Sequence, residues 1–155
     1  MILDKFLEFS DAQAVTSTAI STNVVDLAPL GNGVGTNTVR DIGSGEDVYL
    51  IVRTVQAATD SGSDATLTVT LESDSTENLA TSPTVHFSTG ALAFAAFSPA
   101  GAQICAIKLP AGNYERYVGV RFTVASGPLT AGTFDAFIVK DAQSYRPYAV
   151  GSTIV

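Results

Sequence analysis

Apolar and polar residues alternate with a period of two along much of this 155-residue sequence, which restricts the chain to β structure. The clearest run covers residues 65–73, where Leu67, Val69 and Leu71 alternate with threonines. Because successive side chains of a strand point to opposite faces, this run predicts a half-buried strand with a hydroxyl-lined outer face. Six further runs are predicted as strands: residues 23–27, 48–55, 84–88, 103–109, 117–124 and 133–140.

Clusters of Gly, Pro, Ser and Asp separate these runs and predict turns. The cluster at residues 60–64 predicts a hairpin that pairs the strand at 65–73 with the strand at 48–55. No segment shows a sustained apolar repeat of 3.6 residues, so helix is expected at most over residues 4–9 and 91–97, and both segments could equally be extended. Seven or more strands in one domain predict an all-β chain folded as a two-sheet antiparallel sandwich or a barrel.

Composition agrees with this class and excludes several kinds of partner. Charged residues make up 15% of the chain, against about 25% in an average soluble domain, whereas 18 Thr and 14 Ser supply small hydroxyls. The net charge is −7 and no basic run occurs, so neither direct nucleic-acid binding nor attachment to a membrane is expected. The first eight residues do not resemble a signal peptide, and no uncharged apolar stretch approaches the length of a membrane span. We expect a soluble, intracellular protein.

Residues that carry chemistry are few, so we expect no enzyme, no metal and no cofactor. His86 is the single histidine and sits in a predicted strand, and no nucleophile motif lies near it. Cys105 is the single cysteine, which excludes an intramolecular disulfide and predicts a buried thiol. Residues 60–64 carry two carboxylates and invite comparison with a calcium loop, but a solvated turn is the better interpretation. The glycines of residues 31–35 lack the Lys-Ser/Thr pair of a phosphate loop.

The C-terminal tail, about residues 141–155, is a candidate contact element. Tyr145, Arg146 and Tyr148 surround a proline that favours an extended backbone. Tyr and Arg are enriched at interface cores, so the tail is expected either to contact a partner or to pack back on its own domain.

The sequence also resembles a family of tailed-phage capsid cement (decoration) proteins. The resemblance is most distinctive in the N-terminal block and extends over nearly the whole chain. The matching stretches are residues 1–4, 9–16, 21–27, 40–46, 67–73, 115–120 and 127–139.

The resemblance implies a single jelly-roll domain over residues 1–155, with an N-terminal arm over about residues 1–20. It implies a virion protein that is made in the host bacterial cytoplasm and binds the capsid exterior. There it would clamp neighbouring subunits of the major capsid protein against the pressure of packaged DNA, as a homo-oligomer whose expected form is a dimer. For contacts with the capsid or within the dimer we expect Phe6 and Phe9 of the arm and Tyr145, Arg146 and Tyr148 of the tail.

Two other classes of function remain open at this stage. A glycan- or receptor-binding β-sandwich, as in a fibre or lectin, fits the fold, although the chain contains no Trp for stacking on sugars. A small hydrolase on a β-sandwich would have to be built around His86, and no triad or metal set accompanies it in the sequence.

Overall fold

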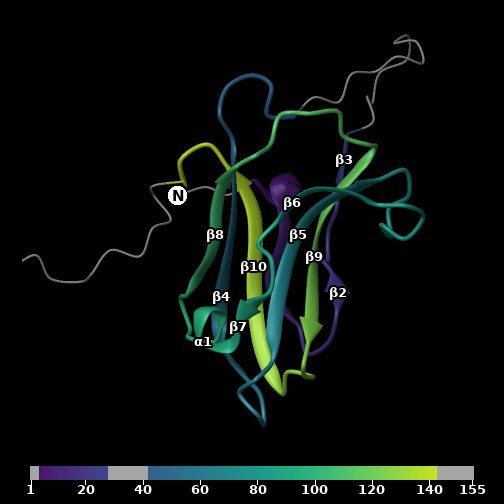
Figure 1. The fold of residues 1–155 in the computed structure, drawn as a ribbon. Helices are drawn as coiled ribbons and strands as arrows, with labels where there is room; N and C mark the ends of the chain where they lie inside the picture. Colours follow the sequence, from purple (N-terminus) through teal and green to yellow (C-terminus); the bar gives the residue numbers. More distant parts are fainter. Residues whose placement is uncertain (1–3, 28–41, 143–155) are drawn as a thin grey trace, which may run out of the picture.

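A computed structural model describes residues 4–27 and 42–142 of the chain. The described residues form ten strands, a 3-10 turn and one short helix (Figure 1). In chain order these are η1 (Lys5–Leu7), β1 (Glu8–Ala14), β2 (Ala19–Ile20), β3 (Val25–Asp26), β4 (Tyr49–Thr59), β5 (Thr66–Asp74), β6 (Thr84–Ser88), β7 (Leu92–Ala93), α1 (Phe94–Phe97), β8 (Gln103–Lys108), β9 (Tyr117–Ala125) and β10 (Ala131–Val139). No helix among the described residues is long and apolar enough to span a membrane.

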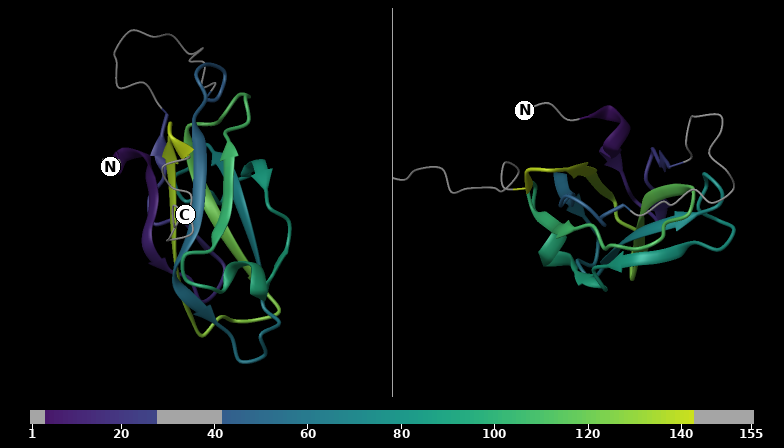
Figure 2. Two further views of the ribbon diagram at one scale, coloured as in Figure 1. Left: turned by 90° about the vertical axis from the view of Figure 1, so that its left-hand side faces the viewer. Right: turned by 90° about the horizontal axis from the view of Figure 1, so that it is seen from above.

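Two antiparallel sheets pack face to face, which confirms the predicted all-β sandwich (Figure 2). The first sheet has the order β1-β10-β4-β8. The second has the order β2-β9-β5-β6, with β3 also paired to β9 and β7 to β5. If β2 and β3 are counted as one interrupted strand, and β6 and β7 as another, the sandwich has eight strands. The first of these pairs with the eighth, the second with the seventh, the third with the sixth and the fourth with the fifth. This nested pairing is that of a jelly roll.

The predicted strand boundaries agree closely with the structure where alternation is strong. Residues 66–71 of β5 alternate between half-buried threonines and fully buried Leu67, Val69 and Leu71, as the sequence predicts. The expected helix at residues 91–97 is confirmed only as the single turn of α1, which follows the two-residue strand β7.

The predicted hairpin between residues 48–55 and 65–73 is wrong. β4 pairs with β10 and β8, whereas β5 pairs with β9, β6 and β7, so the two strands lie in opposite sheets. The segment between them crosses from one sheet to the other, and the Asp60 carboxylate accepts hydrogen bonds from the backbone N–H groups of Asp64 and Ala65. A turn-forming composition shows that the chain reverses, but it does not show whether the second strand returns to the same sheet.

The N-terminal segment, expected as an arm over about residues 1–20, contributes β1 and β2 to the two sheets. β1 pairs with β10 across two register shifts, and Ala12 adopts a φ of +44° within it. These bulges disrupt the alternation that identifies a strand in sequence. The helix expected at residues 4–9 is reduced to η1, which Asp4 caps by accepting the N–H of Phe6 at 2.9 Å.

Phenylalanine rings fill the space between the sheets. The rings of Phe122 and Phe134 lie 5.6 Å apart, and Phe97 of α1 packs on Phe134 at 6.5 Å between centroids. Phe9 of β1 belongs to the same buried cluster. The core therefore connects both sheets, the N-terminal strand and the helix.

Candidate interaction surface

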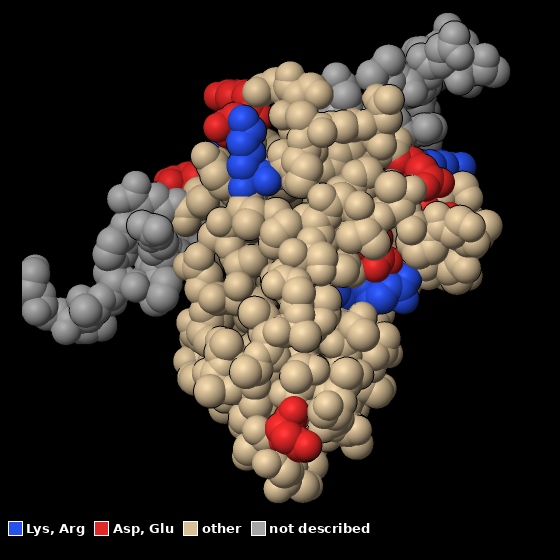
Figure 3. Space-filling model, in the orientation of Figure 1, with Lys and Arg blue, Asp and Glu red and all other residues tan. Residues whose placement is uncertain are grey.

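The stretch from Asn78 to Ile107 contains 30 consecutive residues without an Asp, Glu, Lys or Arg. The fold gathers most of it on one side of the sandwich, where β6, β7, α1 and β8 lie together (Figures 1 and 2). We call the surface formed by residues 84–107 the uncharged face. In Figure 3 the acidic and basic side chains lie around the margin of this side, and its centre carries none of them.

Two ion pairs lie at this margin. Lys108 at the end of β8 contacts Asp47 at 2.5 Å. On the other margin Arg121 binds Glu72 at 2.9 Å and also donates to the carbonyl of Leu79. A surface with an uncharged centre and a charged rim has the composition of a protein–protein interface, whose core is depleted in charged residues.

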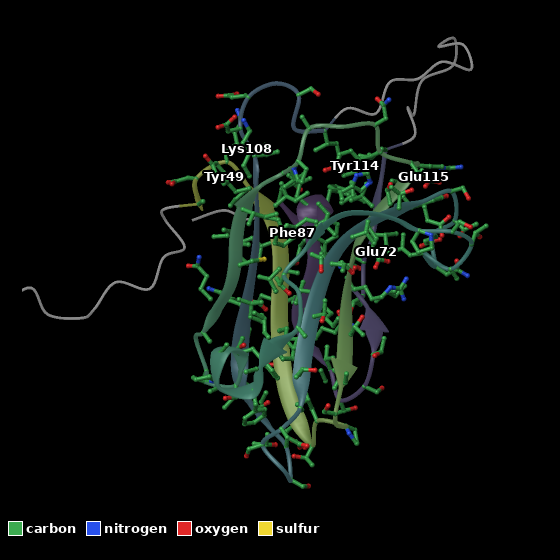
Figure 4. The ribbon with its side chains drawn as sticks, viewed as in Figure 1. Tyr49, Glu72, Phe87, Lys108, Tyr114 and Glu115 are labelled. Carbon is green, nitrogen blue, oxygen red and sulfur yellow. The ribbon has the colours of Figure 1, made fainter. Side chains whose placement is uncertain are left out.

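Both sheets end in a free edge on this side. β8 is the last strand of one sheet and β6 the last of the other, and none of the hydrogen bonds of the described residues joins them. The gap between them is filled by half-buried apolar side chains that pack on the core: Phe87, Leu92, Phe94, Ile104 and Ile107. Figure 4 shows Phe87 between β8 and β5. The core thus reaches the surface here, and two strand edges beside it can accept further backbone pairing.

Small apolar side chains cover the outside of the uncharged face. Val85 of β6 is 53% exposed, and Ala106 of β8 is exposed as well. Ala91, Ala93, Ala95 and Ala96 are also exposed around α1. Alanine and valine lose little side-chain entropy when they are covered, so this surface is suited to close contact with another protein.

His86 lies in β6 at one end of this face, in a strand as predicted. Its Nε2 is 2.7 Å from the Oγ of Ser73, and its ring stacks on Tyr114 with 3.8 Å between centroids. Ser73 Oγ also accepts the backbone N–H of Glu115, so the hydroxyl proton of Ser73 is available for His86 Nε2. Burial lowers the pKa of His86, and the nearby charge of Glu115 partly opposes this shift.

This Ser–His pair is built as a structural contact. Ser73 is fully buried on the inner side of β5, so no substrate reaches its Oγ, and a nucleophile must be reachable to act. The pair instead fastens residues 109–116 to the adjoining ends of β5 and β6. Figure 4 shows Tyr114 and Glu115 at that end of the sandwich.

The other residues considered for chemistry also have structural surroundings that account for them. Cys105 is buried, as predicted, and its burial raises the thiol pKa to about 12. The backbone N–H of Ala65 makes the largest contribution to lowering the pKa of Asp60. Within residues 4–27 and 42–142, no group of three or more His, Cys, Asp or Glu is arranged to hold a metal ion. The glycines of residues 31–35 lie outside the described residues.

The expected contact residues have different positions. Phe6 is 88% exposed on η1 and is available for contact. Phe9 is completely buried in the core of its own domain, so we do not retain it as a contact residue. Tyr145, Arg146 and Tyr148 lie outside the described residues.

The sequence patterns did not lead us to predict the uncharged face, although the run of uncharged residues that forms it can be seen in the sequence. The 30-residue gap between Glu77 and Lys108 is visible without a structure. What the sequence does not show is that strands from two different sheets, together with α1, bring this segment onto one side of the molecule.

The protein-family model described as Bbp16 matches residues 9–138, which extend from β1 to β10 and thus include both sheets. None of the curated proteins matches the chain.

Proposed function

This chain belongs to the phage-related Bbp16 family, and from that premise we propose that it is a structural protein of a phage particle, bound to the outer surface of the head, where it cements neighbouring major-capsid subunits. The observation that carries the proposal is the uncharged face, because a broad surface without charges can be covered by another protein at a low cost of desolvation. We place the contact with the capsid on this face.

The proposed mechanism is mass action. A protein that binds the assembled shell, and not the separate subunits, stabilises the shell by RT ln(1 + [L]/Kd) at each site. Because a shell repeats the same site many times, a modest affinity per site adds up to a large resistance to rupture. No bond is made or broken, and no catalytic residue is required.

The direct test is binding to heads that lack this protein. Co-sedimentation should show saturable binding at micromolar concentrations, and the bound heads should rupture at a higher temperature than bare ones. The absence of binding at these concentrations would contradict the function.

A matched pair of variants tests the face. Ala106→Lys places a charge on β8 within the uncharged face, and Ala14→Lys places the same charge on β1 at the opposite side of the sandwich; both alanines are exposed in edge strands. A buried charge without a partner costs about 3 kcal/mol, so Ala106→Lys should weaken head binding about 100-fold. Ala14→Lys should bind like the wild type. Equal binding by both variants would exclude this face as the contact.

A further inference from the structure

The connection between β5 and β6, residues 75–83, is a polar loop that hydrogen bonds hold in a fixed shape (Figure 1). Asp74 at the end of β5 is buried, and its carboxylate accepts backbone N–H groups from both ends of the loop. One oxygen accepts from Thr76 at 3.3 Å, and the other accepts from Thr81 at 2.8 Å and from Ser82 at 3.4 Å. Both ends of the loop are therefore fastened to one side chain.

Leu79 fixes the middle of this loop. It has a φ of +49°, a conformation that a bulky residue keeps only where its surroundings enforce it. Its side chain is completely buried and packs over Gly119 of β9, where a Cβ would meet Leu79 Cδ1 at 2.8 Å. Its carbonyl accepts the guanidinium of Arg121 at 2.6 Å. The adjacent Glu77 and Asn78 are therefore presented in a fixed position, and a contact with them costs little ordering of the loop.

A hollow of about 230 Å³ lies between this loop and residues 20–24, which follow β2. It is lined by Ile20, Ser21, Thr22, Val24, Glu77 and Asn78. The half-buried Ile20 and Val24 supply an aliphatic wall. The hydroxyl of Ser21 is already engaged, because it donates to one backbone carbonyl and accepts one backbone N–H. The charged group of the hollow is the carboxylate of Glu77.

This carboxylate is not neutralised within the part of the chain that the structure describes. There Glu77 forms no ion pair, whereas Arg116 and Arg121 of the same side are bound by Asp26 and Glu72. An aliphatic wall beside a carboxylate matches the two parts of a basic side chain, which has an apolar stem and a cationic head. The net charge of −7 also attracts a basic partner.

We propose that this hollow binds a lysine or arginine side chain that another protein presents. The stem packs against Ile20 and Val24, and the cationic head pairs with Glu77. The site lies beside β2, at the opposite end of its sheet from β6, so a molecule can bind a partner here while its uncharged face is covered. Binding is measured without heads, so failure of this proposal is distinguishable from failure of the proposed function.

Titration of the full chain, followed through its backbone amide resonances, tests the site with N-acetyl-arginine amide and N-acetyl-lysine amide as probes. At least one of them should give saturable shifts centred on residues 20–24 and 76–79, with a dissociation constant of about 1–10 mM. The neutral counterparts, N-acetyl-citrulline amide and diacetyl-lysine amide, should bind about 5-fold more weakly. Shifts that are spread over the surface, no saturation with either cation, or equal binding of the neutral counterparts would overturn the proposal.

A matched pair of variants tests the role of Glu77. Glu77→Gln keeps the shape of an exposed side chain that holds no part of the fold, and it should weaken binding of the cation about 5-fold while leaving the neutral probes unchanged. Asp11→Asn removes the same charge from an exposed position on β1 and should bind like the wild type. An unchanged affinity of Glu77→Gln, or an equal loss in Asp11→Asn, would show that the cation responds to the net charge and not to this hollow.

Discussion

The two sides of the sandwich are closed by different interactions. On the side of β1, β2 and β3, hydrogen bonds join the two sheets: Gln13 accepts the N–H of Thr22 and donates to the carbonyl of Ile20, while Asn23 donates to the carbonyl of Phe9. We call this the hydrogen-bonded side. On the uncharged face, half-buried apolar side chains lie between β6 and β8, and no hydrogen bond of the described residues joins these two strands directly. A jelly roll needs both sides closed, and on the uncharged face the polar contacts come from the α1 segment, where the hydroxyl of Thr54 donates to the carbonyl of Phe97 and the N–H of Ala58 to that of Ser98.

The difference has a functional meaning. Polar bridges satisfy the strand edges of the hydrogen-bonded side and bulges distort β1, so this side is protected against pairing with another strand. β8 and β6 each pair with their neighbour across one register shift as well, so what the uncharged face lacks among the described residues is a polar bridge between its two edge strands. Natural proteins do not usually leave such an edge unprotected unless it is used.

The largest loss of stability is expected where α1 packs on the core beneath the uncharged face. Phe97→Ala should destabilise the protein by about 3–5 kcal/mol, because Phe97 is fully buried against Phe94 and Phe134 and its removal leaves a cavity. Urea unfolding followed by circular dichroism measures this change. Ala96→Ser, on the exposed side of the same turn, should stay within about 0.5 kcal/mol of wild type. A loss below about 1 kcal/mol for Phe97→Ala would show that this side does not depend on apolar sealing.

The corresponding test on the hydrogen-bonded side removes a carboxylate. Asp135 of β10 is buried, accepts the N–H of Ala12 at 2.7 Å within the β1 bulge, and binds the guanidinium of Arg53 at 2.7 and 2.9 Å. Asp135→Ala leaves these donors without a partner and should cost about 2–3 kcal/mol. Hydrogen exchange of the β1 amides should rise with it. Asp11 is an exposed acid of β1, so Asp11→Ala should leave the free energy of unfolding and the exchange of the β1 amides unchanged. Similar losses of stability for the two variants would contradict the role of Asp135.

A smaller effect is expected from packing above β9, beside β2 and β3. A Cβ on Gly119 would meet Leu79 Cδ1 at 2.8 Å and Val24 Cγ1 at 3.0 Å. Because both are ends of side chains that can shift, Gly119→Ala should cost about 1–2 kcal/mol. Gly45 has no atom within 4 Å of such a Cβ, so Gly45→Ala should be nearly neutral in thermal unfolding. Equal melting temperatures for the two variants would mean that this region is looser than the distances indicate.

The contrast between the two sides also explains what the sequence could predict. The central strands follow from the sequence in two ways: β5 and β9 from alternation, and β4 and β10 from apolar runs that are buried on both faces over part of their length. β1 is too polar and too bulged to reveal itself, and its place depends on partners such as Asp135, which lies 123 residues from Ala12 in the chain. The predicted hairpin was wrong for the same reason, because the sheet to which a strand belongs is decided by partners that are distant in the sequence. The uncharged run of the candidate surface could be found in the sequence, but its position on one face of the molecule could be found only from the order of the strands.

The smallest expected effect is a pH dependence confined to His86, the single titratable group apart from Cys105 in the sequence of the uncharged face. Burial lowers its pKa below the ordinary 6.5, so the folded state binds fewer protons than the unfolded one in this range. The contribution of His86 to stability is therefore complete above pH 6.5, declines as the pH falls from 6.5 towards the folded pKa, and is constant below it. Protonation also turns Nε2 into a donor, so the buried hydroxyl of Ser73 loses its acceptor.

Urea unfolding between about pH 5 and 7.5 isolates this group, because a carboxylate with a lowered pKa, such as Asp60, changes stability only in more acidic solution. The wild type should lose stability over the lower half of that range. His86→Gln keeps an acceptor for Ser73 without a titrating ring, so its stability should be flatter over the same range. A wild type that becomes more stable on acidification, or a His86→Gln variant with the same slope, would show that the contact between β6 and residues 109–116 does not depend on a neutral His86. The polar contact at the end of the uncharged face would then contribute no pH sensitivity, and the apolar side chains would account for the closure of that side at every pH.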